Sequence, residues 1–374
     1  MIVSATTGFI KGFLLHDIEL LQKFGYQVHC AANSKNSTSF DAEEFFKTQK
    51  VTFHNIEFSS VSPFSRFTIK SAKQIKKLLK KEKFDVIHCH TPIAGIIVRI
   101  MAASYRKKGC KIIYTTHGLA FPKGSGIKEK LVYGMVELLG SALSDAIITI
   151  NNEDFCMVKK MLCKKVYYIN GVGVQTSKYH NVKIDRALYR EKIGVGETDI
   201  MVLSVGELSD RKNHQIIIKA LAELNDPQFV FVICGKIMTK SDAYENLVKL
   251  ANELNVKVKF LGFRTDIPEI THCADIAVLP SKREGLGLAG IEALASGIPV
   301  VGSRVQGIKD YVIDGKTGFL CSPTNHCEFS EKIKMLSNPN LRESMRNNCI
   351  KKAEEFSVQV SWKQMEDIYI DMLN

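Results

Sequence analysis

Long hydrophobic runs, paired cysteine motifs and low-complexity tracts are all missing from the 374-residue sequence. The most apolar stretch, residues 93–103, is interrupted by Arg99 and is shorter than the roughly 20 apolar residues that a membrane-spanning helix needs. The start of the chain carries no basic leader, so we expect no secretory signal. We therefore expect a cytoplasmic protein, and leave open at this point whether it attaches to the inner face of the cell membrane.

Metal and disulfide chemistry have little support either. The ten cysteines are scattered and none stands in a C-x-x-C pair, which favours buried free thiols over disulfides or a metal cluster. His88 and His90 could present two imidazoles at a strand end, but no third ligand lies nearby in the sequence. An Asp-x-Asp element is also missing. We expect no metal site and no required cofactor.

The charge of the chain is unevenly distributed. The formal net charge is +12, in a chain with an ordinary globular share of hydrophobic (45 %) and charged (24 %) residues. Residues 1–170 contain 25 basic and 13 acidic side chains, whereas residues 171–374 contain 26 of each. This asymmetry indicates that the first half meets an anionic partner: nucleic acid, a membrane surface or a phosphorylated substrate.

Short apolar runs alternate with helical patterns along the whole chain, which predicts parallel sheets covered by helices on both faces. A helix is predicted at 13–24, 68–81, 128–144, 214–224, 242–254, 288–295 and 358–373. The predicted strands are 2–5, 27–31, 51–56, 86–90, 111–115, 146–150, 166–169, 200–205, 229–234, 258–261, 276–279, 300–302 and 318–320.

The chain is too long for one such sheet, and it breaks naturally at the glycine-rich segment 170–174. We predict an α/β protein of two doubly wound Rossmann-like domains that face each other across a cleft. The first domain is residues 1–170 and the second is residues 171–356. Residues 357–374 form a terminal helix that crosses back to the first domain. Ligands of such sheets bind beyond the carboxyl ends of the strands.

The segment 274–293 carries the strongest chemical signal. A buried strand ends at Pro280, a glycine-containing loop follows, and a helix then begins, which is typical of a phosphate site. Gly285, Gly287 and Gly290 spell G-x-G-x-x-G, but this match lies late in the chain and several residues after its strand, unlike a dinucleotide fingerprint. Glu284 and Glu292 could accept hydrogen bonds from the vicinal hydroxyls of a sugar or a ribose.

These two glutamates and the sequence between them resemble the donor-site signature of family-4 retaining glycosyltransferases. This family (glycosyl transferases group 1) has the GT-B fold, and the similarity points to its capsular and exopolysaccharide members. The resemblance covers nearly the whole chain, because further segments agree in order and spacing: 85–92, 116–118, 170–174, 204–214, 260–266, 295–301 and 314–320.

The resemblance implies transfer of a sugar from a nucleotide diphosphate donor, with UDP favoured, to a hydroxyl of a lipid-linked or oligosaccharide acceptor. Anomeric configuration would be retained without a metal ion or a protein nucleophile. Lys212 would stabilise the diphosphate, after the glycine turn at Gly206. The family often has arginine directly after this glycine, where the chain has Glu207, so we expect Arg211 to substitute for it.

The remaining site residues are also implied by the resemblance. Glu284 and His117 would contact the transferred sugar, and Glu292 the ribose. Arg264 would lie in the loop that faces the nucleobase. The other donor-binding positions are backbone sites that approach the phosphates, at Gly8 in the loop between the first strand and the first helix, and at Gly285, Leu286, Gly287 and Leu288.

The basic half contains a helical pattern at 69–81 with an apolar stripe and a lysine-rich remainder. We expect the stripe (Ile69, Ala72, Ile75, Leu78 and Leu79) to pack on the sheet and the lysines to face outward, toward an anionic membrane or a lipid diphosphate. Nucleic acid is not expected as a partner, since no binding module is present. The alternative functions are a nucleotide-sugar 2-epimerase of the same fold and, below it, an NAD-dependent oxidoreductase.

Overall fold

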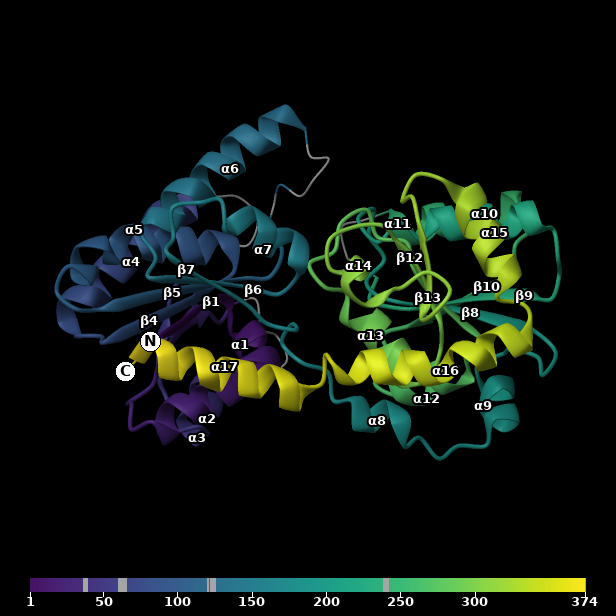
Figure 1. Cartoon of the computed structure of the whole chain (residues 1–374), viewed down its shortest axis with the longest axis horizontal. Helices are drawn as coiled ribbons and strands as arrows, with labels where there is room; N and C mark the ends of the chain where they lie inside the picture. Colours follow the sequence, from purple (N-terminus) through teal and green to yellow (C-terminus); the bar gives the residue numbers. More distant parts are fainter. Residues whose placement is uncertain (36–39, 60–65, 120, 122–125, 238–241, 374) are drawn as a thin grey trace. The chain divides into compact units, whose positions relative to one another are not determined.

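The computed structural model describes residues 1–35, 40–59, 66–119, 121, 126–237 and 242–373, and divides the chain into two compact units. The first unit contains Met1–Val172 and Ser361–Asn374, and the second contains Gly173–Val360. Each unit has one parallel sheet with helices on both faces (Figure 1). The predicted class, an α/β protein with two doubly wound Rossmann-like domains, is confirmed.

The first unit contains a seven-stranded sheet with the strand order β3-β2-β1-β4-β5-β6-β7. Its strands are β1 (Ile2–Thr6), β2 (His29–Asn33), β3 (Thr52–Asn55), β4 (Val86–His90), β5 (Lys111–Thr116), β6 (Ala146–Thr149) and β7 (Lys165–Tyr168). Its helices are α1 (Thr7–Phe13), α2 (Leu15–Lys23), α3 (Ala42–Thr48), α4 (Arg66–Lys81), α5 (Pro92–Arg106), α6 (Ile127–Ala142), α7 (Asn152–Val158) and, from Ser361 onward, α17 (Val358–Leu373).

The second unit contains a six-stranded sheet with the order β10-β9-β8-β11-β12-β13. Its strands are β8 (Ile200–Val205), β9 (Phe229–Cys234), β10 (Val258–Gly262), β11 (Ile276–Leu279), β12 (Val300–Ser303) and β13 (Gly318–Cys321). Its helices are α8 (Thr176–His180), α9 (Arg186–Lys192), α10 (Gln215–Leu224), α11 (Ala243–Glu253), α12 (Ile267–Cys273), α13 (Leu288–Ala295), α14 (Ile308–Tyr311), α15 (His326–Met335) and α16 (Pro339–Glu354).

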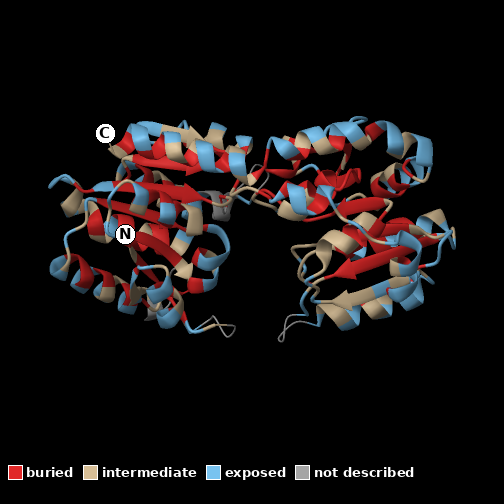
Figure 2. Cartoon of the chain, turned by 90° about the horizontal axis from the view of Figure 1, so that it is seen from below, coloured by how far each residue is buried: buried red, intermediate tan, exposed pale blue. Residues whose placement is uncertain are grey.

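The apolar strands form the core of each unit, as Figure 2 shows by the buried colour along both sheets. Every residue of β4 and of β9 is buried. All thirteen predicted strands occur, with ends that shift by at most two residues. The predicted helix 13–24 is instead two helices, α1 and α2, that meet at Leu14.

The α4 helix confirms the outward lysines but corrects one residue of the apolar stripe. Ile75, Leu78 and Leu79 are buried, whereas Ile69 is 64 % exposed. At 100° per residue, Ile69 lies about 120° around the helix from Ile75, so it misses the sheet. The buried face holds Ser71 in its place.

The structure can also be compared with the predictions about the cysteines and about membrane-spanning helices. All ten cysteines are free thiols, and eight of them are buried. Within the described residues, no helix has both the length and the apolar character needed to span a membrane.

Arg99, which interrupts the most apolar stretch, is fully buried on α5. Its Nη2 donates to the Glu137 Oε2 of α6 at 2.9 Å, and its guanidinium lies 4.0 Å from the centre of the Tyr114 ring. The Tyr114 hydroxyl donates to the other Glu137 oxygen at 3.3 Å. This buried cluster ties α5 and α6 to strand β5.

Replacing Glu137 with alanine should lower the free energy of unfolding by about 3–5 kcal/mol, because it leaves a buried guanidinium without its counter-charge. Urea unfolding measures this loss. The matched control is Glu366→Ala, which breaks an exposed pair with Lys363 and should cost less than about 1 kcal/mol. Equal losses for the two variants would contradict the assignment.

Candidate functional site

In the second unit, β8 and β11 are neighbours, and the strand order reverses between them. Open parallel sheets bind ligands at this topological switch point, beyond the carboxyl ends of the strands. The turn after β8 carries Gly206 and Lys212, and the loop after β11 carries Glu284. The structure therefore brings together residues that are more than 70 positions apart in the sequence.

One carboxylate oxygen forms the centre of this site. The Oε2 atom of Glu284 accepts from Lys212 Nζ at 2.7 Å, from Arg211 Nη1 at 3.2 Å and from Ser281 Oγ at 3.0 Å. Burial raises the pKa of Glu284, but the two cations and the hydroxyl outweigh it, and the pKa lies below its usual range. Glu284 is therefore ionised at neutral pH and neutralises part of the charge of Lys212 and Arg211.

Glu207 positions Arg211. Arg211 Nη2 donates to Glu207 Oε1 at 3.1 Å, and Ser209 Oγ donates to the same oxygen at 3.2 Å. The arginine thus spans two carboxylates and lies beside Lys212 in one cluster. The chain has a carboxylate where the resemblance implies arginine, and this carboxylate orients a guanidinium that comes from four residues further on.

Asn213 is a site residue that the sequence reasoning missed. It is buried, it has a left-handed backbone with φ 58°, and its side-chain amide donates to Pro280 O at 3.0 Å and Pro323 O at 2.9 Å. It therefore fixes the backbone next to Lys212 between the loops that follow β11 and β13. The signal was available, because asparagine tolerates the left-handed region better than other residues with a side chain.

Gly287, which ends the loop after β11, and Gly290 of α13 have structural reasons of their own. Gly287 has φ 81° and caps the N-terminus of α13 without a side chain, while Leu286 is buried and Leu288 begins the helix. A Cβ on Gly290 would lie 2.4 Å from the Tyr311 hydroxyl oxygen. That hydroxyl donates to Gly287 O at 2.9 Å.

Two of the three glycines of the G-x-G-x-x-G match are therefore explained by a turn and by close packing. The loop also follows β11, the fourth strand of its unit, rather than the first strand as in a dinucleotide fingerprint. The oxidoreductase alternative loses its sequence support.

Glu292 and Arg264 each have partners outside the Glu284 cluster. Glu292 of α13 accepts a hydrogen bond from Tyr179, and burial raises its pKa. Arg264 follows β10 at the same sheet edge and forms a bidentate ion pair with Asp266, which also accepts from Tyr189. These hydrogen bonds, above all that from Arg264, lower the pKa of Asp266 to about 2.

The first unit has its own switch point, between β1 and β4. His90 ends β4, and His117 follows β5, with His90 Nδ1 and His117 Nε2 3.2 Å apart. The Phe9 ring packs edge-on against His117 with 4.7 Å between the ring centres. Burial lowers the pKa of His117 to about 4, so its imidazole is neutral at pH 7.

Comparison with known proteins identifies the family. Residues 185–356 match the model described as "Glycosyl transferases group 1", and residues 4–151 match "Glycosyl transferase 4-like". EpsD of Bacillus subtilis, assigned as a glycosyltransferase, is 32 % identical over 365 residues, which cover 96 % of this chain and 93 % of EpsD. The chain belongs to this glycosyltransferase family.

Two other relatives and two solved structures agree. The Escherichia coli UDP-Gal:alpha-D-GlcNAc-diphosphoundecaprenol alpha-1,3-galactosyltransferase is 31 % identical over 82 % of this chain and 80 % of that protein. The capsular polysaccharide glycosyltransferase CapM of Staphylococcus aureus is 26 % identical over 94 % of this chain and 92 % of CapM.

Among solved structures, HepE of Anabaena, in complex with UDP and glucose, has a TM-score of 0.79 at 20 % identity, covering 99 % of this chain and 98 % of HepE. WaaG, a glycosyltransferase involved in lipopolysaccharide biosynthesis, has a TM-score of 0.73 at 18 % identity, covering 98 % of this chain and 99 % of WaaG. These likenesses show the fold, and the predicted GT-B architecture is confirmed.

One predicted position in this glycosyltransferase needs correction. Gly8 was expected in a loop after the first strand, but it lies in the first turn of α1. Strand β1 runs directly into α1 because Thr6 caps the helix, with its Oγ1 accepting from Phe9 N at 3.3 Å. The flexible glycine loop that the resemblance implied is therefore not formed there.

The first unit of the glycosyltransferase also contains a buried polar chain that reaches the C-terminal helix. His88 Nδ1 lies 2.7 Å from the Tyr369 hydroxyl of α17, and this hydroxyl donates to Asp17 Oδ1 at 3.2 Å. Burial raises the pKa of Asp17 to about 7 and lowers that of His88 to about 3. Asp17, His90 and His117 line one pocket with Trp362.

The raised pKa of Asp17 predicts a pH-dependent stability. An unfolded aspartate loses its proton near pH 4, whereas folded Asp17 keeps it up to about pH 7. Its favourable contribution is thus present below about pH 4 and is lost as the pH rises to about 7.

Asp17→Asn keeps a carbonyl acceptor for Tyr369 but cannot ionise. Urea unfolding should show that the free energy of unfolding of the variant, relative to that of the wild type, rises by on the order of 3 kcal/mol between pH 4 and pH 7. Above pH 7 this difference should not change further. A difference that stays constant with pH would contradict the assignment, and histidine titration cancels because both proteins share it.

Proposed function

We propose that this protein is a retaining glycosyltransferase that moves a sugar from a UDP-sugar to a hydroxyl of a lipid-linked or oligosaccharide acceptor, in bacterial surface polysaccharide synthesis. The observation that supports it most directly is the convergence of Lys212 and Arg211 on Glu284, beside the N-terminus of α13. HepE, solved with UDP, and the E. coli galactosyltransferase, named for UDP-Gal and a diphosphoundecaprenol acceptor, support the donor and acceptor classes.

The proposed reaction places negative charge on the diphosphate. The bond between the sugar C1 and the donor phosphate oxygen breaks, and the acceptor oxygen forms a bond to C1 on the same face. The acceptor proton passes to an oxygen of the leaving diphosphate. Lys212, Arg211 and the first-turn amides of α13 would stabilise this charge, which is the largest catalytic contribution in such reactions. These groups supply the positive charge that a metal ion would otherwise provide.

Glu284 has two roles in this proposal. Without donor, it holds Lys212 and Arg211 in place and limits their mutual repulsion. With donor bound, its carboxylate accepts hydrogen bonds from the sugar hydroxyls while the cations turn to the diphosphate. Glu292 would bind the ribose hydroxyls, Arg264 would lie at the nucleobase, and His117 of the first unit would contact the sugar.

Lys212→Ala and Glu284→Ala should each lower kcat/KM by roughly 100- to 1000-fold, the cost of removing one preorganised charge-stabilising group. The assay measures release of nucleoside diphosphate from a panel of nucleotide sugars, with and without acceptor. The matched control is Lys282→Ala, because Lys282 lies in the same loop but pairs with exposed Asp210. Near-normal rates for the first two variants, or isomerised donor without diphosphate release, would contradict the proposal.

We further propose that the first unit attaches to an anionic membrane. Helix α5 packs against both α4 and α6, and the three helices cover one face of the first sheet (Figure 1). The lysines at 70, 73, 76, 77, 80 and 81 of α4 are exposed. Helix α6 exposes apolar side chains that a water-facing helix would not be expected to gather: Leu131, Val132, Tyr133, Met135 and Leu139.

Lysines attract an anionic leaflet, and each contributes about 1 kcal/mol near the surface. Exposed apolar side chains such as those of α6 insert at the boundary between headgroups and acyl chains. Binding to vesicles that contain phosphatidylglycerol should therefore weaken with salt and be lost in a variant with Leu131, Met135 and Leu139 changed to serine.

Sedimentation with vesicles measures this binding. The matched control is Leu188→Ser, which changes an equally exposed leucine of α9 in the second unit and should leave binding intact. Equal binding to neutral vesicles, or binding that is insensitive to salt, would show that the exposed lysines of α4 do not bind the membrane.

A further inference from the structure

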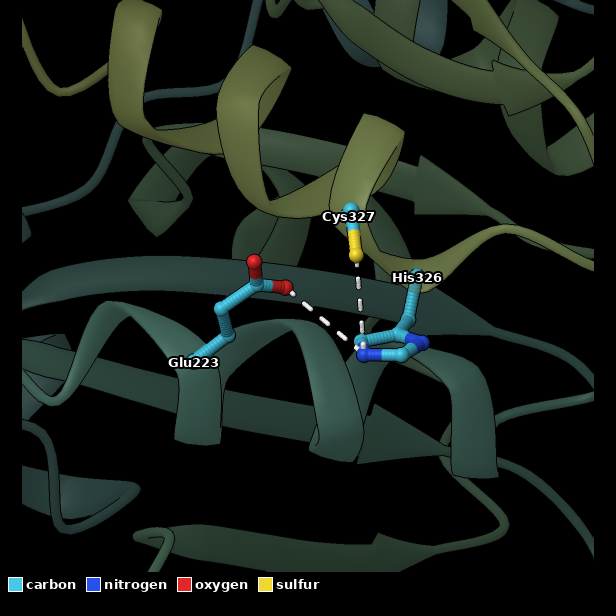
Figure 3. A group of neighbouring side chains, drawn as sticks. All are labelled: Glu223, His326 and Cys327. Carbon is cyan, nitrogen blue, oxygen red and sulfur yellow. Dashed lines mark hydrogen bonds and ion pairs between the residues drawn. The ribbon is translucent and has the colours of Figure 1, made fainter.

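Three metal-ligand side chains meet on the surface of the second unit. Glu223 lies near the end of α10, and His326 and Cys327 begin α15 (Figure 3). Their ligand atoms all lie within 4.8 Å of one another. Lys212 precedes the other end of α10, so about 15 Å of helix separates this cluster from the Glu284 site.

The two distances to His326 are close to those of a tetrahedral zinc site, and the ligand atoms of Glu223 and Cys327 lie within 4.8 Å of each other. His326 Nε2 lies 3.7 Å from Glu223 Oε2 and 3.8 Å from Cys327 Sγ. With zinc bonds of about 2.3 Å to sulfur and 2.0–2.2 Å to nitrogen and oxygen, tetrahedral angles put ligand atoms about 3.3–3.6 Å apart. Small side-chain rotations of the half-exposed Glu223 and His326 close the remaining difference.

The backbone already holds the ligands in place. Asn325 caps α15, with its Oδ1 accepting from Cys327 N at 3.1 Å. Asn325 Nδ2 and the amide of Ser322 both donate to Glu328, at 2.9 and 2.8 Å. Helices α10 and α15 pack together. A metal ion would therefore bind without reordering the backbone.

We propose that Glu223, His326 and Cys327 form a zinc-binding site, with a water molecule in the fourth position. Thiolate, imidazole and carboxylate are the three ligand types that zinc takes from proteins. The Cys327 thiol, whose sulfur lies near His326 Nε2 in the metal-free protein, releases its proton to solvent as the sulfur–zinc bond forms. Bound zinc links α10 to α15 and stabilises the second unit. This inference does not depend on the proposed transferase reaction.

The test uses the full-length protein, freed of metal with EDTA and then cleared of the chelator. Titration with Co²⁺ should give the near-ultraviolet absorption of a cobalt–thiolate bond, and one equivalent of Zn²⁺ should abolish it. Zinc should also raise the midpoint of thermal unfolding. The Cys327→Ser and His326→Ala variants should each bind zinc at least tenfold more weakly and lose the shift in midpoint.

The matched control is Cys156→Ser, which removes the other exposed cysteine, on α7 of the first unit. It should bind zinc like the wild type. Because the ligands lie on the surface, circular dichroism of the metal-free variants should match the wild type. Zinc binding below one equivalent, or binding that Cys327→Ser leaves within threefold of the wild type, would overturn the proposal.

Discussion

Lys212 and Arg211 both form ion pairs with a single oxygen of Glu284, and the rest of the site depends on this interaction. It joins the turn after β8 to the loop after β11 at the place where the strand order reverses. Two cations this close would repel each other without the carboxylate, so Glu284 holds them together. Asn213 and Ser281 complete the arrangement by fixing the backbone and the carboxylate. The parallel sheet supplies the geometry, and the ion pairs supply the charge that phosphate chemistry requires.

The two units differ in net charge and in the kinds of residue that they expose. The second unit is nearly neutral, with 25 basic and 23 acidic side chains, and contains the donor-site signature residues. The first unit carries most of the basic excess, with 26 basic and 16 acidic side chains, and it has exposed lysines on α4 and exposed apolar residues on α6. This asymmetry supports the proposal that the first unit attaches to an anionic membrane. The neutral imidazole of His117 and the buried Asp17–Tyr369–His88 chain belong to the basic unit.

Structural features that depend on residues close together in the sequence could be predicted from the sequence pattern. The strands follow from apolar runs, whereas Lys212 and Glu284 were placed in one donor site by the family resemblance, and their direct contact was not predicted. Contacts between distant segments could not be predicted: Tyr369 reaches His88 across 281 positions, and Glu223 meets His326 only because α10 packs on α15. Gly8 was placed in a loop because of the resemblance to a family position, whereas the cap at Thr6 starts a helix immediately. Ile69 was assigned to the apolar stripe of α4, but it lies about 120° around the helix from Ile75.

The central claim is that the Lys212–Arg211–Glu284 cluster binds the diphosphate of a nucleotide sugar. Thermal unfolding with and without a panel of nucleotide sugars tests it most directly, since a ligand that binds only the folded protein raises the midpoint. The account predicts that a UDP-sugar raises the midpoint of the wild type and that Lys212→Ala loses most of this shift. A shift that Lys212→Ala retains in full, or the lack of any shift with every nucleotide sugar, would contradict it.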